Sequence, residues 1–371
     1  MVSDKNYETT TFRAMKKDRL TDDERIEALW ARQRPDRVPI FPFAGGFASL
    51  NVGYSINDIY TDYKKCIDAQ RWTSDQYGWM PATMCIVGPL SASPVEEFGG
   101  EVTYPTGEYA QAPGVARRPV EKDEDILNLK VPDNLENIGS MPLTLKATAY
   151  QLQFGGIVVS PILATPMDAI GAVVGVEKTC KMMIKKPELV HKALRVLTDF
   201  RIAHAKLWAD KFGAERLVPL VGGPTSSNQI ISPKQFKEFV LPYTKKMHDK
   251  LREMGYKHML IHICGEQNAN MPFWAEINMG DPGIISVGHE IGLETVEKYF
   301  PNDIAFGNLE PAKIQTETPE QVYNASKEII LKGKTIPGGF IFSSGCEMPP
   351  MAPAYNLWMM TKAVNDFGWY E

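Results

Sequence analysis

Three side chains that commonly bind transition metals come at the ends of two apolar runs. His262 and Cys264 close the stretch HMLIHIC, residues 258–264, and Cys346 follows the run GGFIFSSG, residues 338–345. Residues two apart in a strand point to the same face, so His262 and Cys264 are expected to point together. One imidazole and two thiolates form a donor set that zinc binds tetrahedrally, with a fourth position open for a substrate heteroatom.

On spacing alone this signal is weak, because a core histidine and two packing cysteines would give the same pattern. The other three cysteines are predicted to be packing residues: Cys66 and Cys180 fall in helical patterns and Cys85 in an apolar strand. Five cysteines, with no secretion signal at the N-terminus, do not indicate a disulfide framework.

The elements that must position these residues form a regular alternation. Amphipathic helical patterns separate most of eight short apolar runs, which predicts a parallel sheet. Eight strands with helices between them predict a TIM-like (β/α)8 barrel, whose chemistry lies at the C-terminal ends of the strands. His262 and Cys264 then end strand five and Cys346 follows strand eight, so all three are expected on one rim. The runs are 38–43, 81–87, 156–160, 216–221, 258–264, 283–287, 303–308 and 340–344.

Helix signals support this alternation. Residues 232–255 carry an apolar stripe, an N-cap at Ser232 and a stop at Gly255, and Pro242 predicts a kink. Similar patterns occupy 186–213 and 318–333.

The sequence predicts an N-terminal helical lead-in over residues 1–35 and a single barrel domain over 36–371. The stretch 88–150 departs from the alternation and is predicted to contain a β-hairpin insertion after strand two.

Composition excludes several function classes. The net charge is −5 and the pI about 5.8, without the basic footprint of a nucleic-acid-binding protein. The N-terminus has no apolar signal-peptide core. The apolar window 155–175 contains two prolines and Asp168, which favours a strand followed by a helix over a membrane span. The weakly acidic surface fits a cytoplasmic enzyme.

Several motifs together resemble the uroporphyrinogen decarboxylase superfamily. They are RPDRVPIFPF at 34–43, SPKQFKEFVLPYTKKM at 232–247, FGNLEPAKIQTETPEQV at 306–322 and GFIFSSGCEMPPMAPAYNLWMMTKAV at 339–364. The resemblance covers about residues 22–369 and implies a TIM-like barrel, in agreement with the count of eight strands.

Within that superfamily the chain resembles the zinc-dependent, corrinoid-linked methyltransferases. The decarboxylases carry an Arg-Gln-Ala-Gly motif after strand one and an aspartate after the second helix. This chain has FPFAGGFASL (41–50) and YGWMPATMC (77–85) there, and lacks both charged residues. His262, Cys264 and Cys346 match the zinc ligands of the methyltransferases. The two glutamates of their Ser-x-Glu-Glu segment are replaced here by Gly288 and His289, which leaves His289, Glu290, water or substrate as the fourth ligand.

The resemblance implies that the chain moves a methyl group between a small molecule and the cobalamin of a corrinoid protein. That partner must be separate, because the chain lacks the Asp-x-His-x-x-Gly cobalamin-binding motif. An aromatic methyl ether is the favoured donor, since aromatic and small residues over 41–54 are expected to line an apolar pocket. The alternative is a methylcobalamin:thiol methyltransferase of the coenzyme M type. More remote are a decarboxylase-like lyase and a non-enzymatic corrinoid or porphyrin binder.

Polar side chains near the expected rim complete the predicted site. Glu347, His289 and Asn308 are predicted to take part in catalysis by contacting or orienting the substrate, and Glu310 lies nearby. For Glu347, Asn308 and Glu310, a hydrogen bond that stabilises a loop is the simpler alternative.

Overall fold

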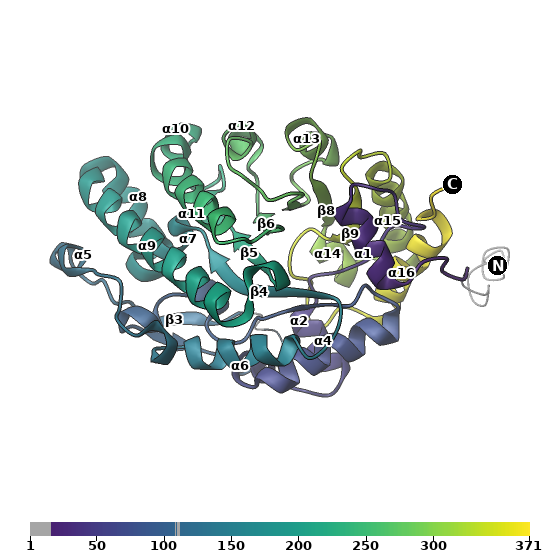
Figure 1. The fold of residues 1–371 in the computed structure, drawn as a ribbon, viewed down its shortest axis with the longest axis horizontal. Coiled ribbons are helices and arrows are strands. Elements are labelled where there is room, and N and C mark those ends of the chain that lie inside the picture. The colour runs from purple at the N-terminus through teal and green to yellow at the C-terminus, as the bar shows by residue number, and fades with distance from the viewer. Residues whose placement is uncertain (1–15, 108, 110–111) are drawn as a thin grey trace.

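The computed structural model describes residues 16–107, 109 and 112–371, and a curled sheet of seven parallel strands lies at its centre (Figure 1). Neighbouring strands pair in the order β1-β4-β5-β6-β7-β8-β9. Seven of the eight predicted strands are thereby confirmed. The strands are β1 (Ala82–Met84), β4 (Ile157–Ala164), β5 (Val218–Gly222), β6 (Leu260–Ile263), β7 (Ile284–Val287), β8 (Ile304–Leu309) and β9 (Phe340–Ser344).

The eighth position is filled by residues 38–43, which do not form the regular strand that the sequence predicts. Ile40 makes one parallel bridge to Phe342 of β9, and the Ile40 carbonyl accepts from Met80 just before β1. Pro39 and Pro42 have no N–H group to donate, so a continuous ladder cannot form there. The segment nonetheless links β9 to the β1 side and completes a TIM-like barrel.

Helices surround the sheet, with α8, α9 and α11 on one flank and α15 and α16 on another (Figure 1). The helices predicted over 186–213 and 318–333 are α9 and α15. The α-helices are α1 (Asp22–Trp30), α2 (Gly45–Asn51), α3 (Ile56–Thr61), α4 (Tyr63–Tyr77), α5 (Asp123–Asn128), α6 (Met141–Gln151), α7 (Pro166–Ile170), α8 (Val176–Lys185), α9 (Pro187–Phe212), α10 (Pro233–Gln235), α11 (Leu241–Glu253), α12 (Met271–Trp274), α13 (Leu293–Tyr299), α14 (Pro311–Thr316), α15 (Pro319–Gly333) and α16 (Ala354–Phe367).

The helix predicted over 232–255 shows how its start and its irregularity arise. Ser232 caps it by accepting from Gln235 N, and the Gln235 side chain accepts from Ser232 N in return. A π-helical turn over Phe236–Val240 joins α10 to α11. It lies directly before Leu241 and Pro242, where the missing proline N–H interrupts regular α-helical bonding. The predicted kink is therefore a π turn.

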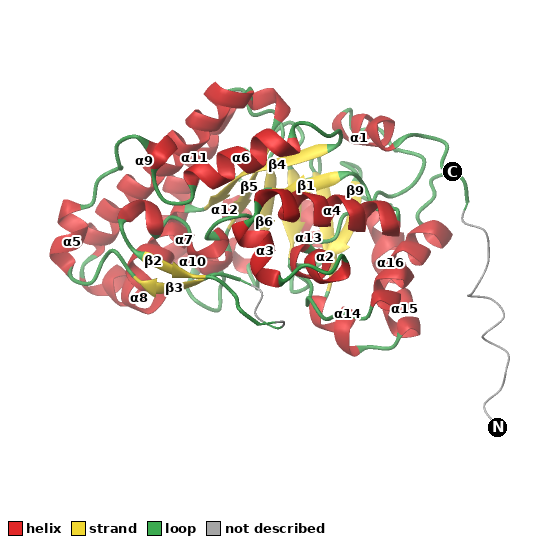
Figure 2. Cartoon of the chain, turned by 90° about the horizontal axis from the view of Figure 1, so that it is seen from below, coloured by secondary structure: helices red, strands yellow, loops and turns green. Residues whose placement is uncertain are grey.

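An antiparallel hairpin stands apart from the main sheet, between β1 and β4 in the chain (Figure 2). Its strands are β2 (Glu101–Thr103) and β3 (Gly114–Arg117). This confirms the insertion predicted after strand two.

Helix α1 of the lead-in packs against the N-terminal ends of the strands. Ile26 and Leu29 are buried in one cluster with Leu260, Ile284 and Ile304, which begin β6, β7 and β8. The Trp30 ring stacks on His258, just before β6, at 3.9 Å between centroids. This end of the barrel is therefore covered, and functional side chains must be sought at the other end.

None of the helices within the described residues is long and apolar enough to cross a membrane.

Candidate metal centre

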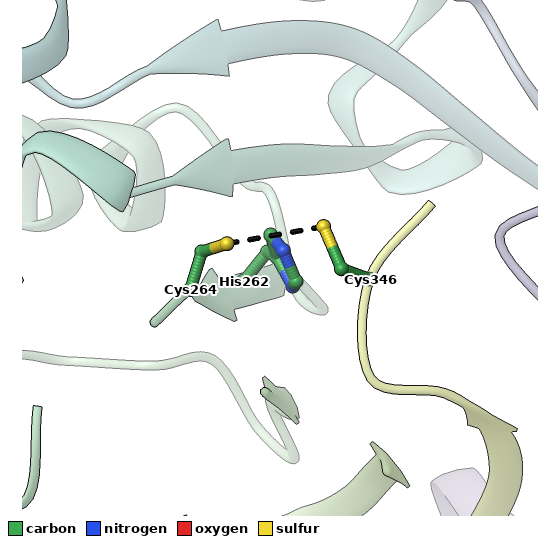
Figure 3. Close-up of side chains that lie close together, drawn as sticks. All are labelled: His262, Cys264 and Cys346. Atoms are coloured by element: carbon green, nitrogen blue, oxygen red, sulfur yellow. Dashed lines mark hydrogen bonds between the residues drawn. The ribbon is translucent and has the colours of Figure 1, made fainter. Parts of the chain in front are cut away.

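The predicted ligands converge at the C-terminal ends of β6 and β9. One donor atom from each of His262, Cys264 and Cys346 lies within 4.8 Å of the other two, and the two Sγ atoms are 3.8 Å apart. Figure 3 shows the two sulfur atoms turned toward each other, with the His262 ring between them in this view. All three side chains are partly exposed, so a ligand can approach them from the rim.

Strand register fixes the orientation of His262. His262 pairs with Ser286 of β7 across the parallel sheet, and its Nδ1 lies 2.9 Å from Ser286 Oγ. The ring of Phe43 packs edge-on against the imidazole at 5.2 Å between centroids. With Nδ1 held by the hydroxyl, Nε2 is the ring nitrogen left for a metal.

The two cysteines share a hydrogen bond that shifts their pKa values in opposite directions. The bond between the thiols lowers the pKa of Cys346 and raises that of Cys264, and His262 also lowers the pKa of Cys346. Cys346 is therefore the better candidate for a thiolate at neutral pH. A thiolate is the form of cysteine that binds metal.

These residues fit a zinc ion. The set contains one imidazole and two sulfur donors, which are softer than the oxygen ligands that magnesium and calcium prefer. Three protein donors leave one position of a tetrahedral zinc site open, as in catalytic rather than structural sites.

Glu347 follows Cys346 directly and lies against the start of α2. Its Oε1 accepts a hydrogen bond from Gly46 N at 3.0 Å. Burial raises the pKa of Glu347 to about 7, and the neighbouring Cys346 charge adds to the effect. A catalytic role for Glu347 stays a prediction, and the structure shows a loop contact as well.

His289 and Asn308 lie at the same end of the barrel but outside the group of three donors. The His289 side chain is 43% exposed and its Nδ1 is 3.5 Å from Glu290 Oε2. Asn308 is buried, and its amide nitrogen donates to the carbonyls of Gly288 and Ile291. Asn308 thus supports the loop after β7, and catalytic roles for both residues remain predictions.

Two polar residues near the site were not predicted from the sequence to belong to it. Ser286 appears there only as part of a motif, although its register opposite His262 makes it the imidazole's partner. Asp168 of α7 is buried and its Oδ1 accepts from Thr225 N at 2.7 Å. Its charge contributes to the raised pKa of Cys264, after the bond to Cys346 and burial. Only strand register and loop packing reveal these contacts.

The aromatic residues after the first segment pack into the protein. Phe41, Phe43 and Phe47 are 6%, 5% and 4% exposed, and Phe43 lies 5.1 Å from Phe306 between ring centroids. Phe41 and Phe43 belong to the buried cluster that also contains Phe306, and Phe47 packs against Tyr77 in a second buried cluster. The observation that favoured an aromatic substrate therefore has the simpler explanation of core packing.

Residues 21–367 match the family described as Uroporphyrinogen decarboxylase (URO-D). A methylated-thiol–coenzyme M methyltransferase of Methanosarcina mazei is 29% identical over 240 residues, covering 63% of this chain and 61% of that relative, under two thirds of its length. A methylcobamide:CoM methyltransferase of Methanosarcina acetivorans is 26% identical over 271 residues, covering 70% of this chain and 74% of that protein.

A solved structure described as a methyltransferase from Methanosarcina mazei has the same fold. It superposes with a TM-score of 0.78 at 21% identity, over 94% of this chain and 99% of the other. The fold and the family inferred from the motifs are thus confirmed, and the relatives named here are methyltransferases. The chain belongs to the uroporphyrinogen decarboxylase (URO-D) family.

Proposed function

We propose that this protein is a zinc-dependent methyltransferase that moves a methyl group between a small molecule and the cobalamin of a separate corrinoid protein. The observation that carries the proposal is the convergence of His262, Cys264 and Cys346 within 4.8 Å on the open rim of the barrel. The names of the relatives support it, since they are methyltransferases that act on coenzyme M and on methylcobamide or methylated thiols.

Bound zinc would supply a Lewis acid that lowers the pKa of a thiol or polarises the heteroatom of a methyl donor. The chain's own residues prepare the site for this. Ser286 holds Nδ1 of His262 at 2.9 Å and so directs Nε2 to the metal position. The bond between Cys264 and Cys346 lowers the pKa of Cys346, which favours the thiolate form that binds metal. For Glu347, which follows Cys346 in the chain, we propose proton exchange with the substrate; its pKa of about 7 supports this role.

Of the two methyl-transfer readings, thiol chemistry has the better support. The relatives' names refer to thiols and coenzyme M. The aromatic residues that favoured an aromatic methyl ether are buried in the core. O-demethylation therefore remains a second reading, for which the rim geometry gives no specific observation.

A decarboxylase-like lyase is the third reading, and the site argues against it. A metal-free decarboxylation of a polycarboxylate needs cationic groups in the cleft and does not need three converging soft donors. The described site has those three donors, and residues 44–55, which directly follow the first barrel segment, contain no arginine.

The first experiment is the metal content of purified, chelator-washed protein after incubation with zinc. We expect about one zinc per chain. Cys346→Ser should lower the bound zinc well below half and reduce methyl transfer between methylcobalamin and a thiol, followed by the cobalt spectrum.

Cys180→Ser is the matched control, because Cys180 is a partly buried free cysteine on α8. It should bind zinc like the unaltered protein. Full zinc content and full activity in Cys346→Ser would refute the ligand assignment.

A further inference from the structure

The residues that directly follow the barrel strands contain almost no basic side chains when the hairpin insertion from Glu101 onward is left out. These eight segments hold 77 residues, with Lys313 as the single lysine and no arginine. Lysine and arginine make up 40 of the 371 residues in the chain, so an even distribution would place about eight there. In a parallel barrel these segments together form the rim around the site. They are 44–55, 85–100, 165–175, 223–232, 264–270, 288–292, 310–316 and 345–353.

Acidic residues are present on the rim at an ordinary frequency. The segments contain seven carboxyl groups and one lysine, so the rim carries a surplus of acidic groups. The Nζ of Lys313 lies 3.7 Å from Glu310 Oε2, so this lysine offsets one of them. The carboxylates are Glu96, Glu97, Asp168, Glu266, Glu290, Glu310 and Glu347.

Three arginines from outside these segments reach them among the described contacts, and all three are already engaged. Arg201 of α9 is fully buried and bonds to Ser93. Arg117 of β3 donates to the Gly99 carbonyl and pairs with Glu101. Arg118, after the hairpin, donates to the backbone carbonyls of Gly171 and Ala172. Arg201 cannot touch a substrate, and the test below includes Arg118, which bonds to the segment after β4.

Three backbone N–H groups on this rim, which could otherwise bind an anion, are occupied by carboxyl groups of the protein. Glu347 accepts from Gly46 N at the start of α2, Asp168 from Thr225 N, and Glu266 from Asn268 N. The protein's own carboxylates thus fill positions in which a sulfonate or carboxylate of a substrate would bind.

We propose that the methyl donor or acceptor of this site is uncharged or cationic outside its reacting atom, and that anionic substrates such as coenzyme M are disfavoured. This rests on the proposed function and defines its substrate class. The three proposed metal donors mark the position of the site, and the scarcity of lysine and arginine around it disfavours negatively charged substrates. The chain would then differ from its coenzyme M-using relatives in substrate although it shares their family.

The test uses thiols that share the HS–CH2–CH2– unit and differ in the other end. They are 2-mercaptoethanol, 2-aminoethanethiol and 2-mercaptoethanesulfonate, which is coenzyme M. Binding is followed in the cobalt(II)-substituted protein through the near-ultraviolet sulfur-to-cobalt absorption. Each affinity is calculated from the concentration of the thiolate form, so that differences in thiol pKa do not enter the comparison. At low ionic strength we expect the sulfonate to bind at least about fivefold more weakly than 2-mercaptoethanol, with the gap narrowing as salt is added.

Two lysine substitutions provide the matched comparison. Glu266→Lys puts a cation two residues from Cys264, and should bring sulfonate binding up to that of 2-mercaptoethanol. Glu215→Lys makes the same charge change just before β5, at the other end of the barrel. It should leave the ratio of the affinities for the sulfonate and for 2-mercaptoethanol unchanged. Glu310→Lys serves as a second rim variant if Glu266→Lys does not fold.

The outcomes separate this inference from the proposed function. Sulfonate binding equal to or tighter than that of 2-mercaptoethanol in the unaltered protein overturns the inference and leaves methyl transfer intact. Loss of that tight binding in Arg118→Gln would then identify Arg118 as the anion anchor. Failure of cobalt(II) to bind, or of every thiol to change its absorption, would overturn the proposed function and this inference with it.

Discussion

At the scale of single residues, the orientation of one imidazole depends on one hydroxyl. Ser286 Oγ lies 2.9 Å from Nδ1 of His262 and so leaves Nε2 as the ring nitrogen for the proposed metal. Removing such a partner of a metal-binding histidine typically costs 10–100-fold in metal affinity. We therefore expect Ser286→Ala to weaken zinc binding about 10–100-fold in competition with a chromophoric chelator, with a loss of about 1 kcal/mol in unfolding free energy.

Ser343 offers a matched control for that measurement. It is a fully buried serine of β9 whose Oγ has no hydrogen-bond partner in the described structure. Ser343→Ala should leave zinc affinity unchanged. Equal losses in the two variants would mean that the Ser286 hydroxyl acts through general packing and does not orient His262.

At the scale of elements, the lead-in is joined to the barrel by an ion pair. The Asp36 carboxylate is buried and accepts from Arg25 Nε at 2.8 Å and from the amides of Arg19 and Leu20. Burial alone would raise the pKa of Asp36, but these hydrogen bonds lower it to about 2. Because the folded-state pKa is lower than the unfolded value, this stabilisation is present above about pH 4 and is lost as the pH falls toward 2.

Asp36→Asn should therefore lower the free energy of unfolding at pH 7 by at most about 2 kcal/mol, since solvent screens part of the interaction. The difference from the unaltered protein should shrink between pH 4 and pH 2 in urea unfolding curves. Asp75→Asn, at an exposed position on α4, should change neither. A constant difference across this pH range would show that the effect is one of packing.

The elements also show how far the sequence leads. Period-two alternation and barrel closure predicted that His262, Cys264 and Cys346 meet on one rim, because both rules follow from backbone geometry alone. Residues 38–43 were predicted to form the first strand because they are apolar. That prediction is wrong for a regular strand, because Pro39 and Pro42 interrupt the hydrogen-bond ladder. The contact of Ser286 with His262 depends on the register between β6 and β7, which hydrophobic pattern does not specify when both faces are buried.

At the scale of the whole molecule, one end of the barrel is covered by a helix and the other carries the candidate site. Helix α1 covers the N-terminal ends of the strands, where Leu29 and Trp30 pack against residues that precede or begin them. The opposite end carries the three donors on segments that leave β6 and β9. The three donors therefore follow strands of a sheet whose core is apolar side chains, and we expect this sheet to assemble without the proposed metal.

Removing zinc should consequently leave the barrel folded. We expect the far-ultraviolet circular dichroism of the chelator-treated protein to match that of the zinc-loaded protein. Zinc at 100 times its dissociation constant should stabilise the native state by about 2.7 kcal/mol and raise Tm by a few degrees. The rise should disappear in Cys346→Ser and persist in Cys180→Ser, measured by differential scanning calorimetry. Loss of secondary structure on zinc removal would instead mean that the metal, and not the packed sheet, holds β6 and β9 together.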